Sequence, residues 1–185
     1  MATMLKSDTD VVSFLKEQHE QIKVLFMSVK ATSGKERATQ FYALRRLLAV
    51  HETVEEEIVH PAARRALSDG DTIVAARLRE EQIAKDVLTS LEKQDVDSAE
   101  FERTFLDLEK AVIDHAEAEE HQEFERLKSA LDQHQLVRMR RAAEIAEAVA
   151  PTRPHSGIES AAANLITGPF ASMVDRTRDA LAGKA

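Results

Sequence analysis

The sequence contains no cysteine and no tryptophan, only five glycines and four prolines, and aromatic residues make up 4% of it. The absence of cysteine excludes disulfides, thiolate nucleophiles and thiolate metal sites, so any metal must be bound through nitrogen and oxygen. Because glycine, proline and aromatic residues are scarce while Ala, Leu, Glu, Lys, Arg and Gln are abundant, the composition favours helix and argues against a β-sheet protein.

Long apolar runs and long basic runs are also missing. No stretch approaches the roughly 20 apolar residues of a membrane-spanning helix, and the opening MATMLKSDTDVV has no apolar signal-peptide core. The formal net charge is −8, so the basic surface typical of a general nucleic-acid binder is not indicated. We therefore expect a cytoplasmic protein with neither stable membrane insertion nor a nucleic-acid partner.

Apolar residues recur at spacings of three and four in four segments, which predicts four amphipathic helices. We expect them over about 8–29, 36–67, 71–93 and 99–127, with a continuation of the last to about 148 left open. Pro61 lies inside the second segment and should kink that helix or remove a hydrogen bond. Short loops between such helices predict an all-α, up-down-up-down four-helix bundle with one shared core.

Two prolines and a glycine at 151–157 end the helical pattern. The residues beyond them are amphipathic and rich in small side chains, which indicates one or two short helices that pack on the bundle or on a neighbouring subunit. The sequence thus predicts a bundle domain over 1–150 and a linker with a C-terminal helical tail over 151–185. A homodimer through this tail is a candidate assembly.

Two stretches place a histidine and a glutamate four positions apart: His51 and Glu55 in HETVE, and His115 and Glu119 in HAEAE. Residues i and i+4 share one face of a helix, so each pair can bind a common ion. Both pairs lie on the apolar stripe of their segment, where burying an unpaired carboxylate costs several kcal/mol. Metal ions would supply the missing partner.

A third imidazole, His19, lies on the apolar stripe of the first segment, and the internal repeat requires a counterpart in the third segment, which has no histidine. Glu81 precedes three apolar positions by the same intervals as His19 precedes its own, whereas Glu80 and Gln82 fit less well. If HEQI in the first segment is instead aligned with EEQI in the third, Glu80 corresponds to His19. We predict Glu81 as a metal ligand and Glu80 as a non-ligating acid that could carry protons.

With His19 in EQHEQIKVLF, followed by HETVEEEIVHP and HAEAEEHQEF, residues 8–130 resemble the hemerythrin-type HHE cation-binding proteins. The C-terminal SGIESAAANLITGPFASMVDRTRDAL is similar to the tail of actinobacterial, especially mycobacterial, hemerythrin-like proteins. This resemblance implies a four-helix bundle around two non-haem iron ions, bridged by carboxylates and an oxo or hydroxo group. The ligands that carry over by motif are His19, His51, Glu55, His115 and Glu119.

Two features depart from the oxygen-carrying members of that family. Glu81 replaces a histidine, and each additional carboxylate favours ferric over ferrous iron, which hinders reversible oxygen carriage. Mycobacterial hemerythrin-like proteins are associated with catalase-like peroxide breakdown, so both arguments favour a di-iron enzyme acting on hydrogen peroxide. The alternatives are a protein that binds or senses dioxygen, nitric oxide or iron without turnover, and a bundle without metal. His60 stands where the family often has an aromatic residue; we expect it half-buried beside Pro61 or lining an access route.

Overall fold

The computed structural model describes residues 9–149, and within this range the chain is helical apart from short turns. Two π-helical turns, η1 and η2, interrupt two of the long helices. The elements in chain order are α1 (Val11–Ala31), α2 (Gly34–Val54), η1 (Glu55–Val59), α3 (His60–Ala66), α4 (Gly70–Leu91), α5 (Ala99–Glu119), η2 (Glu120–Phe124), α6 (Glu125–Ala130) and α7 (Gln133–Val149). No helix in residues 9–149 is long and apolar enough to cross a membrane.

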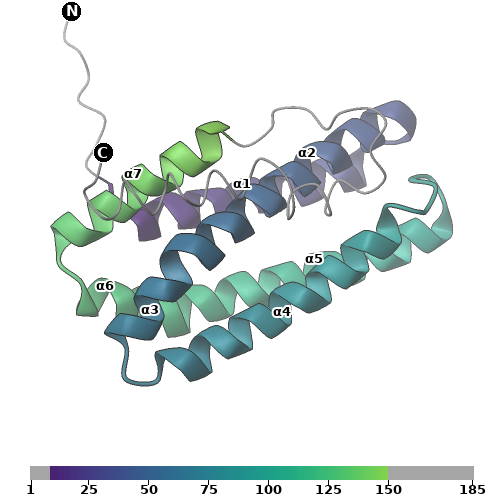
Figure 1. Cartoon of the computed structure of the whole chain (residues 1–185). Coiled ribbons are helices and arrows are strands. Elements are labelled where there is room, and N and C mark those ends of the chain that lie inside the picture. The colour runs from purple at the N-terminus through teal and green to yellow at the C-terminus, as the bar shows by residue number, and fades with distance from the viewer. Residues whose placement is uncertain (1–8, 150–185) are drawn as a thin grey trace, which may run out of the picture.

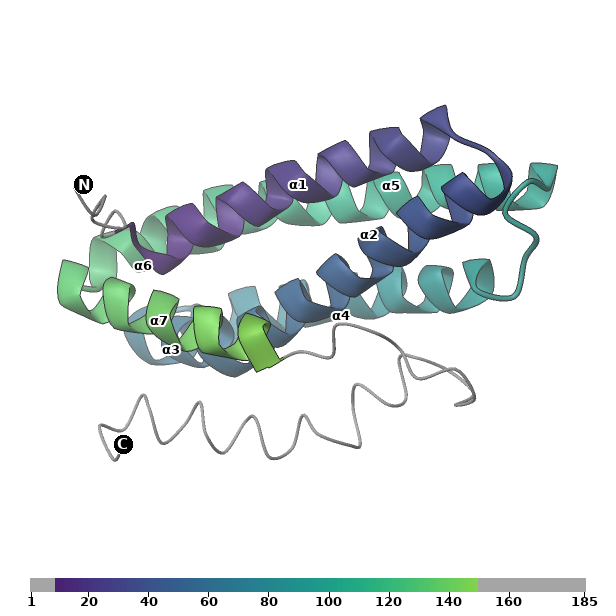
Figure 2. The same ribbon diagram turned by 90° about the horizontal axis from the view of Figure 1, so that it is seen from above.

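The helices form two antiparallel hairpins that pack on one another (Figure 1). In the first hairpin α1 pairs with α2, which continues through η1 into α3; in the second α4 pairs with α5, which continues through η2 into α6. Figure 2 shows α1, α2, α4 and α5 extending along one direction of the molecule. The predicted all-helical bundle with antiparallel packing is confirmed.

The fourth predicted segment does not continue as one helix to about residue 148; a separate helix, α7, follows it instead. α6 ends at Ala130, Leu131 is extended, and α7 turns back to pack against α1 and α2. Asp132 starts it with a capping box, because its Oδ1 accepts a hydrogen bond from Gln135 N–H at 2.8 Å, while Gln135 Oε1 accepts one from Asp132 N–H at 2.9 Å. α7 buries Leu136, Met139, Ala142, Ala143 and Ala146.

The turns that close the hairpins at one end are tied to each other. Gly34 begins α2 with a φ of +57°, a conformation that residues with a side chain rarely adopt. Its N–H lies 2.9 Å from the carboxylate of Asp97, in the loop between α4 and α5. Ser98 then caps α5 by accepting a hydrogen bond from Phe101 N–H at 3.1 Å. The first hairpin is therefore anchored to the second at this end of the bundle.

Two apolar clusters fill the bundle, and a layer of buried polar side chains separates them. α1, α2 and α4 pass from one cluster to the other at this layer, and α5 does so through its continuation into η2 and α6; on α1, for example, Leu15 belongs to one cluster and Ile22 to the other. Phe124 and the side chains of α7 belong to the first cluster. The aromatic residues of the second cluster are Phe26, Phe41, Phe101 and Phe105. The polar layer contains the histidines and glutamates that the sequence singled out.

The predicted linker and tail over 151–185, and the homodimer expected through them, lie outside the described residues. The domain boundary at residue 150 stays a prediction.

Candidate metal centre

The structure brings together all six residues that the sequence predicted as metal ligands. They come from both hairpins, and none is more than 9% exposed. α1 supplies His19, α2 supplies His51, η1 supplies Glu55, α4 supplies Glu81, and α5 supplies His115 and Glu119. Their role as ligands remains a prediction, but their placement is the one that a shared ion requires.

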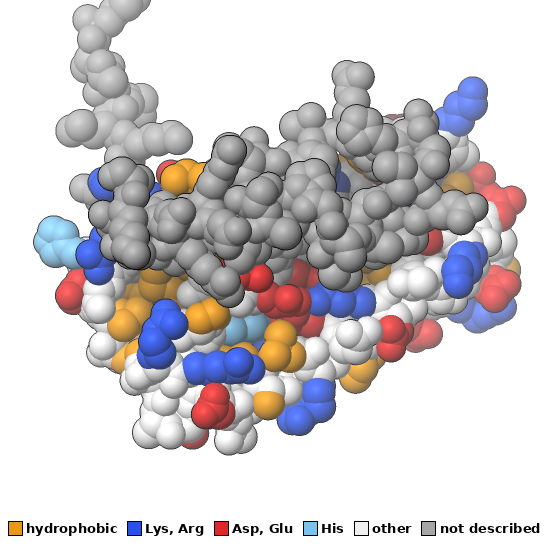
Figure 3. All heavy atoms as spheres, in the orientation of Figure 1, with side chains coloured by type: hydrophobic (Ala, Val, Ile, Leu, Met, Phe, Trp, Pro, Cys, Tyr) orange, Lys and Arg blue, Asp and Glu red, His pale blue; other side chains and the backbone are white. Residues whose placement is uncertain are grey.

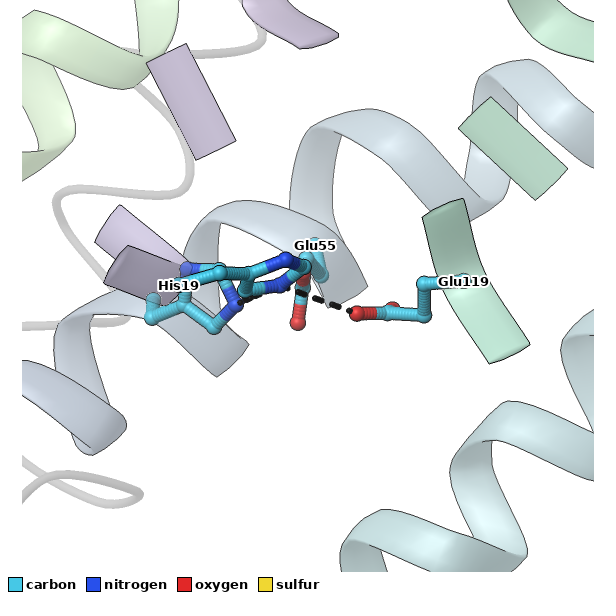
Figure 4. A group of neighbouring side chains, drawn as sticks. His19, Glu55 and Glu119 are labelled. Carbon is cyan, nitrogen blue, oxygen red and sulfur yellow. Dashed lines mark hydrogen bonds and ion pairs between the residues drawn. The ribbon is translucent and has the colours of Figure 1, made fainter. Parts of the chain in front are cut away.

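The donor atoms face one another at short distances. His19 Nε2 lies 3.0 Å from His51 Nε2, which in turn lies 3.0 Å from Glu55 Oε1. Glu119 Oε2 reaches to 3.5 Å from both His19 Nε2 and His115 Nε2. Figure 4 shows His19 and Glu119 pointing toward each other from different helices, with Glu55 beside them. Two donors bound side by side to one ion, with bonds of about 2.1 Å, lie about 3 Å apart, so these spacings fit a cation.

The donors divide into two overlapping groups. Within each group all donor atoms lie within 4.8 Å of one another. Glu55 belongs to both groups and is therefore positioned to bridge two cations. The first group is His19, His51, Glu55 and Glu119, and the second is Glu55, Glu81 and His115.

Unpaired buried atoms at the centre support the same interpretation. Both carboxylate oxygens of Glu55, both of Glu119 and Nε2 of His115 are buried without a hydrogen-bond partner among the described residues. Although His51 Nε2 approaches Glu55 Oε1 closely, the angles are not those of a hydrogen bond. Buried polar groups without partners are costly and rare. The residues present therefore fit a pair of cations.

Each of the four buried imidazoles of the polar layer has an oxygen as hydrogen-bond partner at its Nδ1. An imidazole whose Nδ1–H donates to an oxygen is fixed in orientation and keeps Nε2 available for a metal. The four pairs, with their Nδ1–oxygen distances, are His19–Glu120 at 2.8 Å, His51–Gln18 at 2.9 Å, His60–Glu123 at 2.9 Å and His115–Glu80 at 3.0 Å. Glu80, predicted as a non-ligating acid, thus contacts His115, and its transfer of protons stays a prediction.

In the metal-free protein, protonation of the buried carboxyl groups of Glu55 and Glu119 replaces the neutralising charge of a cation. Burial raises the pKa of the Glu55 carboxyl to about 7. Burial, together with the nearby negative charge of Glu55, raises the pKa of Glu119 to about 7 as well. Burial and the positive charge of His19 lower the pKa of His51 to about 3. The ionised forms of Glu55 and Glu119 are therefore disfavoured until a cation neutralises them, whereas, against burial, the hydrogen bond with His60 lowers the pKa of Glu81.

Comparison with known proteins identifies the domain. Residues 10–127 match the family model described as Hemerythrin HHE cation binding domain. The chain belongs to this family. It is similar to the crystal structure of a hemerythrin HHE cation binding domain-containing protein of Mycobacterium kansasii, an Rv2633c homolog, with a TM-score of 0.67 over 91% of this chain and 99% of that chain. At 21% identity this likeness shows the fold alone.

A second similarity covers only part of a longer protein. A protein of Nostoc sp. described as a DNA nickase is 24% identical over 132 residues, which is 70% of this chain. The chain spans 37% of the length of that relative.

This hemerythrin HHE domain has a fourth buried imidazole, His60, that the sequence did not place at the centre. Only 2% of it is exposed, so the expected half-buried position beside Pro61 is wrong. Its Nε2 lies 2.9 Å from Glu81 Oε1 and its Nδ1 2.9 Å from Glu123 Oε1. Burial opposes protonation of His60, but the hydrogen bonds with Glu123 and Glu81 outweigh it and raise its pKa to about 10.

The π turn η1 explains why the sequence misplaced His60. In a regular α-helix, a residue nine positions after His51 points about half a turn away from it. Here His60 N–H bonds to Glu55 C=O, five residues back, so the helix contains one wider turn just before Pro61. This turn rotates His60 toward the centre. The second hairpin has a π turn at the corresponding place without any proline, where Glu125 N–H bonds to Glu120 C=O, so Pro61 alone is not the cause.

A pocket opens beside the metal centre of this HHE domain, and His60 is not among its lining residues. The metal-centre residues that line this pocket are His19, His51, Glu81 and His115. Glu52 also lines it. Glu52 Oε2 is 3.4 Å from Lys85 Nζ, and burial raises the pKa of Glu52 to about 8. The apolar lining residues are Ile22, Leu48, Ala84, Val112, Ile113 and Ala116.

Proposed function

We propose that this hemerythrin-family protein binds two non-haem iron ions and decomposes hydrogen peroxide. The observation that carries the proposal is the carboxylate-rich donor set, in which Glu55, Glu81 and Glu119 are buried together among imidazoles. Hard oxygen donors favour ferric iron, which a peroxide-decomposing site tolerates better than a reversible oxygen carrier. The absence of cysteine leaves only nitrogen and oxygen donors, as non-haem iron sites of this kind use.

Each hairpin would contribute to both ions. His19, His51, Glu55 and Glu119 would hold the first ion, while Glu55, Glu81 and His115 would hold the second. When bound, iron would supply Lewis acidity and the capacity to exchange electrons with peroxide.

The pocket would admit the small oxidant and limit what else enters. Its walls are mainly apolar, which suits a small uncharged molecule such as hydrogen peroxide, dioxygen or nitric oxide. Glu52 lines this pocket and belongs to neither donor group, so its carboxyl is placed to exchange a proton with a peroxide oxygen. Glu80, which the sequence favoured for this role, instead accepts a hydrogen bond from His115.

Neither a nucleic acid nor a membrane is part of the proposed function. The formal net charge is −8, and where the described residues are visible in Figure 3, acidic and basic side chains are intermixed. The Nostoc relative is described as a DNA nickase, but this chain spans only 37% of that protein's length.

The test compares iron content with oxygen evolution from hydrogen peroxide. We expect about two irons per chain and an oxygen-evolution rate that rises in proportion to iron occupancy. The double variant His51→Ala/His115→Ala should lose both iron and activity, whereas His134→Ala, which removes an exposed imidazole, should keep both. Stoichiometric iron in the double variant would refute the site assignment.

The alternative function gives a different result in the same experiment. Iron-loaded protein that takes up dioxygen or nitric oxide reversibly after reduction, but evolves no oxygen from peroxide, would be a carrier or sensor. Natively expressed, folded protein without bound metal would refute both.

A further inference from the structure

We propose that His60 is a fourth imidazole ligand of the cation pair, bound through Nε2 to the ion held by Glu81 and His115, and that Glu123 positions it. This inference rests on the two-cation site of the proposed function but on no reaction of peroxide.

The distance between His60 and Glu81 has the value expected for two ligands of one ion. His60 Nε2 lies 2.9 Å from Glu81 Oε1. The two contacts between donors of the first group, His19 with His51 and His51 with Glu55, are both 3.0 Å. Donors bound side by side at about 2.1 Å from an ion lie about 3 Å apart. His60 Nε2 is therefore close enough to Glu81 to share an ion with it, although its donor atoms lie outside the 4.8 Å group of Glu55, Glu81 and His115.

Glu123 holds His60 as the other imidazoles are held. It is completely buried, and its Oε1 lies 2.9 Å from His60 Nδ1. The other three buried imidazoles have an oxygen at the same nitrogen, within 3.0 Å, and turn Nε2 toward the centre. Donor atoms of His60, Glu119 and Glu123 also lie within 4.8 Å of one another, which places this ring beside a ligand of the first ion.

Comparison of the two hairpins shows that α4 lacks an imidazole for which His60 can substitute. Gln18, next to His19, accepts a hydrogen bond from His51, and Glu80, next to Glu81, accepts one from His115. This correspondence sets Glu81 at the position of His19, so α4 lacks the imidazole that α1 provides.

The position of His60 in the first hairpin corresponds to that of Phe124 in the second, nine residues after the histidine of each motif. The Phe124 ring stacks on His19, with centroids 5.8 Å apart and planes 12° from parallel. His60 instead directs a nitrogen at Glu81. With His60 as a ligand each ion has two imidazoles, His19 and His51 for the first and His60 and His115 for the second. The imidazole missing from α4 is thus supplied from the start of α3, directly after the π turn η1.

The test counts bound imidazoles in cobalt(II)-loaded protein by proton NMR. A ligating imidazole gives a ring N–H resonance with a large paramagnetic shift, and here each Nδ1–H is held by an oxygen. We expect His60→Gln to remove one shifted N–H resonance and to weaken binding of the second cobalt ion about tenfold or more. The control His134→Gln, at an exposed position, should retain every shifted resonance. An unchanged count of shifted resonances in His60→Gln would overturn the proposal.

Two variants test the positioning role of Glu123. Glu123→Gln keeps an oxygen that can accept the Nδ1–H bond, whereas Glu123→Leu removes it. We expect the Gln variant to keep the His60 resonance and the Leu variant to lose it, with about 10- to 100-fold weaker binding of the second ion. Equal spectra for the two variants would contradict the role of Glu123.

A crystal structure of the cobalt-loaded wild type decides the question if the His60 variant does not fold. A distance near 2.1 Å between His60 Nε2 and cobalt supports ligation, and retention of the His60–Glu81 hydrogen bond without a metal contact refutes it. If His60 is not a ligand while the iron protein still decomposes peroxide, this inference fails and the proposed function stands. If His60 binds cobalt but the iron protein evolves no oxygen, the proposed function fails and the inference stands.

Discussion

Replacing Glu119 by glutamine should stabilise the metal-free protein and strongly reduce its stabilisation by metal. Glu119 is fully buried, neither of its carboxylate oxygens has a hydrogen-bond partner within residues 9–149, and burial raises its pKa from 4.5 to about 7. Because the folded protein holds this proton more tightly than the unfolded chain, the free energy of unfolding falls as the pH rises from about 4.5 to about 7 and stays low above it.

The size of this effect follows from the pKa shift. Roughly 2.5 units correspond to about 3 kcal/mol at pH 8, reduced by whatever the buried amide itself costs. For a chain of this length such a gain raises the melting temperature by about 10 °C at most. At pH 5 the folded carboxyl is protonated but the unfolded one is already mostly ionised, so the gain should fall to about 1 kcal/mol or less.

Thermal unfolding with a chelator present, at pH 5 and pH 8, checks this prediction. Glu117→Gln is the matched control, because Glu117 is exposed on the same helix two residues away, and its melting temperature should not change. With a divalent metal at a hundred times its dissociation constant, wild type should gain about 2.7 kcal/mol, and Glu119→Gln much less. A metal-free variant no more stable than wild type at pH 8 would refute the argument that the unpaired carboxylate is a cost of folding.

Three further predictions follow from the geometry. Glu81→Gln should reduce metal stoichiometry, whereas Glu80→Gln should keep stoichiometry and weaken affinity by no more than about 10- to 100-fold; equal metal content by elemental analysis would contradict the assignment of α4. Metal affinity measured by calorimetry should fall as the pH drops from 8 to 6, because Glu55 and Glu119, with pKa values raised to about 7, must lose protons to bind; a flat profile would exclude them as ligands. Gly70→Ala should destabilise the fold by about 1–3 kcal/mol in urea unfolding, because its Cβ would lie 2.3 Å from a backbone oxygen of α3, and metal stoichiometry should persist.

Helix periodicity was enough to predict the bundle and the meeting of the residues that we predict as metal ligands. His51 with Glu55, and His115 with Glu119, lie four apart on stripes that face the core, so any packing of those stripes brings them together. Counting apolar positions also distinguished Glu81 from Glu80, which the structure places at the centre and behind His115, respectively.

The features of the site that the sequence did not reveal depend on local departures from the regular α-helical period. His60 reaches the centre only because η1 contains a π turn, and Glu123, which holds it, lies within η2. A pattern based on 3.6 residues per turn places His60 on the side of its helix opposite His51, so periodicity alone directs its ring away from the centre. The break before α7 had a readable signal, the capping box from Asp132 to Gln135, but the apolar pattern runs across it.

The sharing of carboxylates links metal binding to the docking of the two hairpins. The first hairpin supplies His19, His51 and Glu55, yet its donor group is completed by Glu119 of the second. The second supplies Glu81 and His115, and its group is completed by Glu55 of the first. Neither hairpin can form either group alone, and the polar layer interrupts the apolar contacts that would otherwise join the two halves of the core. A cation bound at this centre should therefore hold the two hairpins together, so metal binding should raise the free energy of unfolding of the wild type.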